Sequence, residues 1–261
     1  MILVRDCKGH AELEACVQLE IETWGYDPTE VIPRKAFLVW QKVGGQVIGA
    51  FDTESASEGS PESLVGFVLS LPGVKTAKGE PHPYLHSHML AVRESYRNRG
   101  VGVQLKLAQR HDALERGIRL IEWTFDPLEI KNAFLNIHKL GAIARRYEVD
   151  FYGVSSSRLQ GGLPTDRLVA EWQLDSPRVE AILERRPSLA KVIEERISVP
   201  SSIYQWKASE AHRPLALALQ LENRVQFQEA FSRGLAVVGY TVDAEGNGVF
   251  ELGRLTQPEA G

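Results

Sequence analysis

The segment LAVRESYRNRGVG, residues 90–102, decides how the chain folds around its candidate site. Its first three residues are apolar and end a predicted strand over 83–92. After a turn, Gly100 and Gly102 open a predicted helix that runs to Arg116. Glycines leave the backbone N–H groups of a helix N-terminus accessible to an anion, and the helix dipole favours negative charge there. The segment therefore predicts a site for a pyrophosphate group.

Two well-known phosphate-binding loops do not fit this segment. A P-loop needs Lys and Ser or Thr after the second glycine, where this chain has Val103 and Gln104. A dinucleotide-binding loop needs a small residue where Leu105 stands. A glycine-containing turn that only joins a strand to a helix stays open as the alternative.

Hydrophobic periodicity around this segment predicts a mixed α/β protein of the α+β type. Polar turns join strands at short range, which indicates antiparallel pairs and not the regular alternation of a doubly wound sheet. The predicted strands are 2–5, 46–52, 64–71, 83–92, 118–125, 145–152, 167–174, 192–199, 235–242 and 249–255, and the predicted helices are 10–25, 35–42, 102–116, 130–140, 179–186 and 211–233.

Length and composition limit the class of protein. The 261 residues allow two domains, and we expect residues 1–175 to form one and residues 176–261 a smaller α/β domain. The formal charge of -4 argues against a nucleic-acid partner. We expect no membrane segment and a cytoplasmic location, because no apolar run approaches about 18 residues. Cys7 and Cys16 are read as reduced and structural.

The run Arg97-Asn98-Arg99-Gly100-Val101-Gly102, preceded by Leu90-Ala91-Val92, resembles the acyl-CoA signature of the GNAT superfamily. The resemblance covers about residues 1–175. It implies a GNAT-like fold, in which a mixed, mostly antiparallel central sheet is flanked by helices, here with a C-terminal extension that could be a partial repeat. The donor-binding residues it implies are Leu90, Ala91, Val92, Arg97, Asn98, Arg99, Gly100, Val101, Gly102, Val103 and Asn132.

The resemblance also implies the chemistry. An acetyl, succinyl or other short acyl group would pass from acetyl-CoA or another acyl-CoA to a primary amine that attacks the thioester directly. The pantetheine arm would add to the edge of the 90–92 strand, and the N–H of Ala91 or Val92 would meet the oxyanion. The chain departs from the family at Ile137, where many members have a tyrosine acid, so Tyr147 or Tyr152 could replace it unless the thiolate leaves unaided.

Two carboxylates are candidates for the proton acceptor. Glu122 and Asp126 fall on one face of the predicted strand 118–125 or just past it. Asp126 is the first choice and Glu122 the second, with ordinary solvated carboxylates as the alternative.

The acceptor is expected to be a small-molecule amine such as an amino acid, with protein N-termini or lysines as the alternative. His86 and His88 alternate onto one strand face and would line its pocket. An amino-acid carboxylate would suit the guanidinium groups of Arg145, Arg146 and Arg167, which could equally be surface arginines. A homodimer is left open.

Two other classes of function compete with this interpretation. His82, His86 and His88 could bind a metal as the histidines of a cupin do, but the helices predicted on both sides contradict that barrel, so no metal is expected. The missing tyrosine also allows a non-catalytic acyl-CoA sensor.

Overall fold

The computed structural model describes residues 1–54, 61–77, 79–186 and 192–254. The chain divides into two compact units, one made of Met1–Trp123 with Ser156–Leu159 and the other of Thr124–Ser155 with Gln160–Gly261. Residue 176 lies inside the second unit, and the domains 1–175 and 176–261 stay a prediction.

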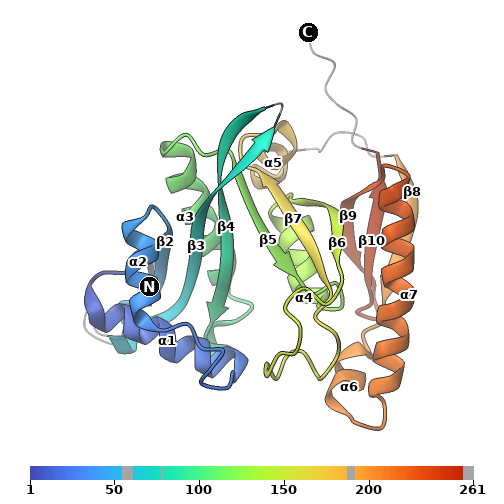
Figure 1. Cartoon of the computed structure of the whole chain (residues 1–261), viewed down its shortest axis with the longest axis horizontal. Helices are drawn as coiled ribbons and strands as arrows, with labels where there is room; N and C mark the ends of the chain where they lie inside the picture. The colour runs from blue at the N-terminus through green and yellow to red at the C-terminus, as the bar shows by residue number, and fades with distance from the viewer. Residues whose placement is uncertain (55–60, 78, 187–191, 255–261) are drawn as a thin grey trace. The chain divides into compact units, whose positions relative to one another are not determined.

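The first unit is a sheet covered by helices on both faces (Figure 1). Its strands lie in the order β1-β2-β3-β4-β5, with antiparallel neighbours except for the parallel pair β4 and β5. The strands are β1 (Ile2–Asp6), β2 (Gln46–Asp52), β3 (Leu64–Ala77), β4 (Glu80–Val92) and the first part of β5 (Leu120–Phe125). The helices are α1 (Gly9–Trp24), α2 (Arg34–Lys42) and α3 (Val101–Glu115), with short 3-10 turns η1 (Pro61–Ser63) and η2 (Glu94–Tyr96).

Strand alternation divides the core of this unit into two layers. On β2, Val47 and Phe51 join the cluster under α1 and α2, whereas Ile48 and Ala50 join the cluster that includes Leu105 of α3. Because successive strand residues point to opposite faces, an uninterrupted apolar run fills both layers.

The second unit holds an antiparallel sheet in the order β7-β6-β9-β10-β8. Phe227 of its longest helix packs edge-on against Phe250 at 5.2 Å between ring centroids. The strands are β6 (Ile143–Glu148), β7 (Arg167–Gln173), β8 (Ile193–Val199), β9 (Ala236–Val242) and β10 (Gly248–Gly253). The helices are α4 (Ile130–Ala133), which continues as the π-helix η3 (Phe134–Lys139), α5 (Pro177–Leu183), α6 (Ile203–Ala208) and α7 (Arg213–Ser232).

The predicted fold class is confirmed: the elements are mixed α/β with mostly antiparallel strands flanked by helices. Several local features differ from expectation, among them the strand predicted over 145–152, which ends at Glu148. β3 and β4 extend further into a long hairpin, the helix 130–140 changes from α to π, and α6 was not predicted. A six-residue helix is too short to show a periodic pattern, which explains why sequence reasoning missed α6.

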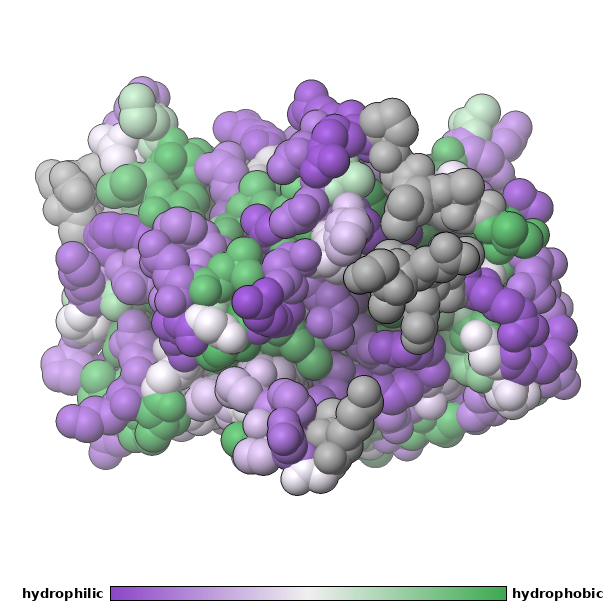
Figure 2. Space-filling view, turned by 90° about the horizontal axis from the view of Figure 1, so that it is seen from above, coloured by the Kyte–Doolittle hydropathy of each residue, from purple (hydrophilic) through white to green (hydrophobic). Residues whose placement is uncertain are grey.

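Hydrophilic residues dominate the face shown in Figure 2, and hydrophobic ones form separate patches among them. Among the described helices, none is both sufficiently long and sufficiently apolar to cross a bilayer.

Glu20 of α1 carries a carboxylate in the interior of the first unit. Its side chain is buried, and Oε1 accepts a hydrogen bond from the Ile32 N–H at 3.0 Å. Within the described residues, Oε2 has no hydrogen-bond partner. Burial raises the pKa of Glu20 to about 7, against the lowering effect of the Ile32 hydrogen bond. The folded state therefore favours the protonated form.

Glu20→Gln should stabilise the protein at pH 8 and leave its stability nearly unchanged at pH 4.5. A carboxyl group whose pKa is raised on folding stabilises fully below its unfolded pKa, and that stabilisation is lost as pH rises through 7. Allowing for partial solvation, we expect a gain of about 1 to 2 kcal/mol at pH 8, measured by urea unfolding. Glu14→Gln, on the exposed side of α1, serves as control and should show no such pH dependence. An equal effect of Glu20→Gln at both pH values would contradict the assignment.

Candidate functional site

β4 and β5 separate inside the first unit. Among the described residues, the two strands pair at only two positions, Leu85 with Ile121 and His86 with Glu122. Ser87 to Val92 continue β4 beyond the last of these pairs. Over this stretch β4 has no ladder partner on its β5 side among the described residues, although the Val92 carbonyl accepts from Arg97 Nε.

A β-bulge lies where the strands separate. On β3, Leu69 and Ser70 are consecutive, but their partners on β4 are Met89 and Ser87, so His88 is an extra residue. A bulge bends its strand and changes which face the following side chains occupy. Ser87 accordingly bonds to α3, whereas Met89 packs in the cluster under α1 and α2.

The loop after β4 is fixed by side-chain contacts at its base. The Tyr96 hydroxyl donates to Asp52 Oδ2 at 2.7 Å, and Arg97 Nε donates to the Val92 carbonyl at 3.1 Å. The Arg99 guanidinium lies 5.4 Å from the centre of the Tyr96 ring. These contacts hold Arg97 to Gly100 as an exposed turn immediately before α3.

The N-terminus of α3 is arranged as an anion site. Asn98 and Gly100 both adopt left-handed backbone conformations, with φ of 60° and 82°. No side chain of the described chain caps this end, and the first helical bond runs from Gln104 N to the Gly100 carbonyl. The N–H groups of the first turn, from Val101 to Val103, therefore have no partner within the helix. A Cβ added at Gly100 would meet no atom within 4 Å, so this cradle is open.

Polar side chains line the face of the sheet under α2, beside the end of the β4–β5 pairing. The His86 and His88 rings lie 6.0 Å apart, and His88 meets Trp40 of α2 edge-on. Glu122, next to His86 in the register, is ion-paired with Lys75 of β3. Burial lowers the pKa of His86, opposed by the nearby Glu122 charge, and burial lowers that of His88 to about 4. Both imidazoles are therefore neutral at pH 7.

A buried lysine on the opposite face was not predicted. Lys106 of α3 donates to Ser87 Oγ at 2.9 Å and to Gln109 Oε1 at 3.0 Å. Its Nζ lies 3.7 Å from the centre of the Trp123 ring of β5. Helical spacing places Lys106 beside the buried residues Val101, Leu105, Gln109 and Ala113 of α3. This position in the helix is the feature of the sequence from which its burial could have been predicted.

In the second unit, Asp126 is engaged by neighbouring groups. Oδ1 accepts from the Leu128 N–H at 2.8 Å, and Oδ2 accepts from Lys207 Nζ at 2.9 Å. Lys207, itself buried, also reaches Glu129 Oε1 at 2.7 Å. Burial would lower the pKa of Lys207, but the two carboxylates outweigh it and the pKa is raised. Asp126 thus belongs to a buried three-residue ion cluster whose lysine lies 81 positions away.

The two candidate tyrosines differ in their surroundings. The Tyr147 hydroxyl donates a hydrogen bond of 2.7 Å to Asp166. Asp166 also accepts two hydrogen bonds from the Arg224 guanidinium, at 2.8 and 3.0 Å. Burial and this hydrogen bond raise the pKa of Tyr147 well above its usual range. Tyr152 is exposed, and its hydroxyl lies 2.8 Å from Thr124 Oγ1. Tyr147 therefore has the contacts of a structural residue, whereas Tyr152 is accessible.

The predicted acceptor arginines bond within the second unit. Arg145 reaches Glu171 Oε2 at 2.6 Å and Arg146 reaches Oε1 of the same residue at 3.4 Å. Arg167 donates to the Asp166 carbonyl and to Gln160. Asn132 of α4, which was predicted to bind the acyl-CoA donor, accepts a hydrogen bond from Asn136 Nδ2 at 3.2 Å. Binding of a carboxylate by these arginines stays a prediction.

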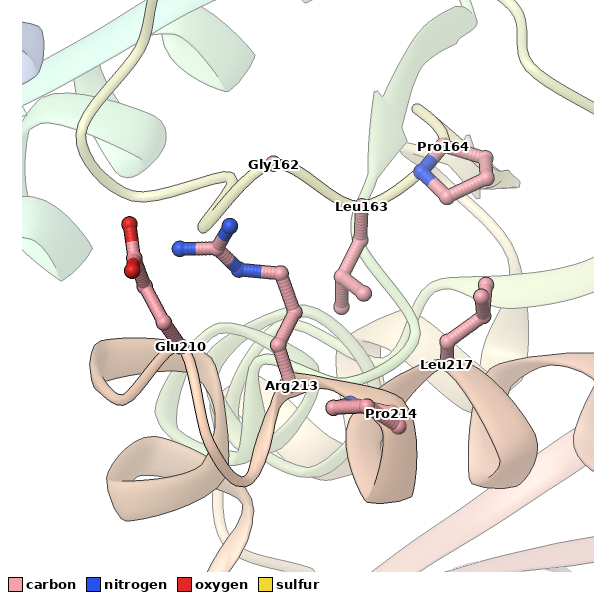
Figure 3. A pocket seen from close by; sticks show the side chains of 7 residues that line it. All are labelled: Gly162, Leu163, Pro164, Glu210, Arg213, Pro214 and Leu217. Atoms are coloured by element: carbon pink, nitrogen blue, oxygen red, sulfur yellow. The ribbon is translucent and has the colours of Figure 1, made fainter.

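The second unit also has a shallow cavity of about 240 Å³ at the start of α7 (Figure 3). It is apolar apart from Glu210 and Arg213, and its lining residues are Gly162, Leu163, Pro164, Glu210, Arg213, Pro214 and Leu217. Over the described ranges, His, Cys, Asp and Glu side chains form no group of three or more that could hold a metal ion.

Comparison with solved structures identifies the fold. The chain is similar to Arabidopsis thaliana NAA60 in complex with acetyl-CoA, with a TM-score of 0.54 and 16% identity over 67% of this chain and 100% of that chain. It is also similar to yncA of Salmonella typhimurium with its cofactor acetyl-CoA, with a TM-score of 0.51 and 15% identity over 67% and 95% of the two chains. At these identities the likeness concerns the fold alone. Among curated proteins, no sequence matches the chain.

The sequence itself supplies the family. Residues 13–136 match the family model of the acetyltransferase (GNAT) family. This range includes the divergence of β4 from β5, the turn at residues 97–100 and the open N-terminus of α3. The resemblance expected from residues 90–102 is confirmed, and residues 13–136 of this chain belong to the acetyltransferase (GNAT) family.

Proposed function

We propose that this protein is an acyl-CoA-dependent N-acyltransferase that acylates a primary amine. The observation that carries the proposal is the uncapped N-terminus of α3, where left-handed Asn98 and Gly100 precede three unpartnered N–H groups. Such a terminus suits the pyrophosphate of coenzyme A, because backbone donors and the helix dipole both favour an anion. Arg97 and Arg99 add positive charge beside it.

The unpaired edge of β4 supports the position of the rest of the donor. Amide groups of the pantetheine arm can bond to the backbone of Leu90 to Val92, as an added strand would. The thioester would then lie between β4 and β5, where the N–H of Ala91 or Val92 can stabilise the oxyanion. The amine nitrogen attacks the thioester carbonyl, the C–S bond breaks, and the products are an amide and free CoA.

We propose His86, supported by Glu122, as the group that takes the proton from the amine. His86 is neutral at pH 7, and a neighbouring carboxylate stabilises the imidazolium that forms. The ion pair of Asp126 with Lys207, whose side chain is only 7% exposed, disfavours the first choice from sequence. Glu122 is less constrained, because its partner Lys75 is 35% exposed and water can replace it.

The acceptor is proposed to be a small-molecule amine, with a protein N-terminus or lysine as the alternative. The charged and imidazole groups of Lys75, His86, His88 and Glu122 favour a short polar substrate. Release of free CoA from acetyl-CoA, measured across amino acids, alkylamines and peptides, distinguishes these acceptors. A non-catalytic sensor would bind acetyl-CoA and release no CoA with any of them. A cytoplasmic location and a homodimer stay predictions.

Gly100→Val should abolish binding of CoA while the fold survives. A side chain there strains the left-handed backbone and covers the N–H groups of the α3 first turn. Gly117→Val is a matched control, because Gly117 ends the same helix with φ of 74° and also has open space around its Cβ. Calorimetry should show CoA affinity reduced at least about tenfold for Gly100→Val only. Undiminished affinity in this variant would refute the donor site.

Glu122→Gln should lower the maximal rate about a hundredfold at pH 7 and leave CoA affinity intact, the usual scale for lost general-base catalysis. It should also lower the pKa of His86 further in an NMR titration, because the negative charge that favours imidazolium is gone. Asp126→Asn is compared with Lys207→Met, since both disrupt the same ion cluster. If Asp126→Asn loses the rate and Lys207→Met does not, Asp126 is the base.

Tyr147→Phe and Tyr152→Phe should each leave the maximal rate within about threefold of the parent. A thiol with a pKa near ~8.5 leaves without a dedicated acid. Tyr147→Phe should reduce stability by about 1 kcal/mol, because the buried Asp166 loses one donor. A hundredfold loss of rate in Tyr152→Phe would instead identify its exposed hydroxyl as the acid.

A further inference from the structure

On the α3 side, the side chain of Lys106 lies at the place where β4 and β5 diverge. Ser87 and Trp123 are the first residues beyond the last paired positions, His86 and Glu122. Lys106 Nζ contacts both of them, by a hydrogen bond of 2.9 Å to Ser87 Oγ and at 3.7 Å from the Trp123 ring centre. The lysine is only 2% exposed, so its amine is buried against the first residue of each strand beyond the paired positions.

The distance along β4 connects this point with the proposed donor site. The stretch from Ser87 to Val92 has six residues and spans about 20 Å as an extended strand. A pantetheine arm that follows this edge from the α3 N-terminus has a similar length. Its thioester end would therefore reach the level of Ser87, and the acyl group would point toward Lys106.

We propose that Lys106 forms the end wall of the acyl site and limits the donor to short acyl groups. This inference rests on the proposed function. Lys106 is a specificity-determining residue here and takes no part in bond making. Ser87, Gln109 and Trp123 hold its amine in place, and Gln109 is fully buried behind it.

The chemistry of the wall suits a short acyl chain. A longer chain could enter only if it displaced the Lys106 amine from Ser87 and Gln109, which would cost this buried amine both of its hydrogen bonds, although Ser87 Oγ would still donate to Gln109 Oε1 at 3.1 Å. Burial lowers the pKa of Lys106 well below its ordinary value, which reduces the cost of an acyl methyl group beside the amine.

Affinities for acetyl-CoA and hexanoyl-CoA, measured by calorimetry without an acceptor, test this proposal. The parent protein should bind hexanoyl-CoA at least tenfold more weakly than acetyl-CoA. Lys106→Ala removes the wall and should shift the ratio of the two dissociation constants at least tenfold in favour of hexanoyl-CoA. Lys106→Met fills the same space and should keep the ratio within threefold of the parent. Leu107→Ala, on the exposed side of the same turn, should change nothing.

An unchanged ratio in Lys106→Ala would overturn the proposal, as would equal affinity of the parent for both thioesters. If Lys106→Ala does not fold, Trp123→Leu is tested instead, because it removes the ring that packs against the Lys106 amine. It should shift the ratio of the two dissociation constants in the same direction. An unchanged ratio in Trp123→Leu would contradict the proposed role of Lys106. Absence of acetyl-CoA binding by the parent protein would instead refute the proposed function, so the two failures are distinguishable.

Discussion

The extra residue in β4 is the constraint on which the site depends. Because His88 has no partner on β3, β4 changes the facing of its side chains between Ser87 and Met89. Ser87 points to α3, whereas Met89, two positions later, packs in the cluster under α1 and α2 on the side where His88 meets Trp40. The bulge also lies directly after the last β4–β5 pair, so the strand bends where the parallel pairing ends. Without it, β4 could continue along β5 and the proposed thioester gap would be filled by backbone hydrogen bonds.

Paired burial of charge decides which ionisable groups remain available for chemistry. Lys207 binds Asp126 and Glu129, and Arg224 binds Asp166 with both forks. Removing one member of such a buried cluster leaves an uncompensated charge, at a typical cost of about 3 to 5 kcal/mol. Asp126, Glu129 and Asp166 therefore each contribute to a buried ion cluster of the second unit. In the proposed mechanism His86, whose pKa burial lowers, takes the proton beside Glu122, whose partner Lys75 is 35% exposed.

The helix after β5 shows a limit of register arguments. The comparison of Ile137 with the family's tyrosine counts four residues back from Gly141 along a regular helix. The helix changes to π geometry over Phe134–Lys139, which adds a residue to the turn and rotates the side chains that follow. A family position counted back from the glycine therefore does not keep its direction. Phe134 and His138 stack at 4.4 Å across this turn, four positions apart.

The sequence by itself determined most of the elements and the glycine turn before α3. Strand alternation, helix periodicity and the glycines at 100 and 102 act over a few residues, so LAVRESYRNRGVG predicted the strand, the turn and the open N-terminus of α3 correctly. Tertiary structure alone decided the partners of the ionisable groups. Lys207 meets Asp126 across 81 positions, Arg224 meets Asp166 across 58, and Lys106 lies between Ser87 and Trp123. Local patterns predict which face a side chain occupies, but a charge acquires its partner, and hence its chemistry, only when distant segments pack together.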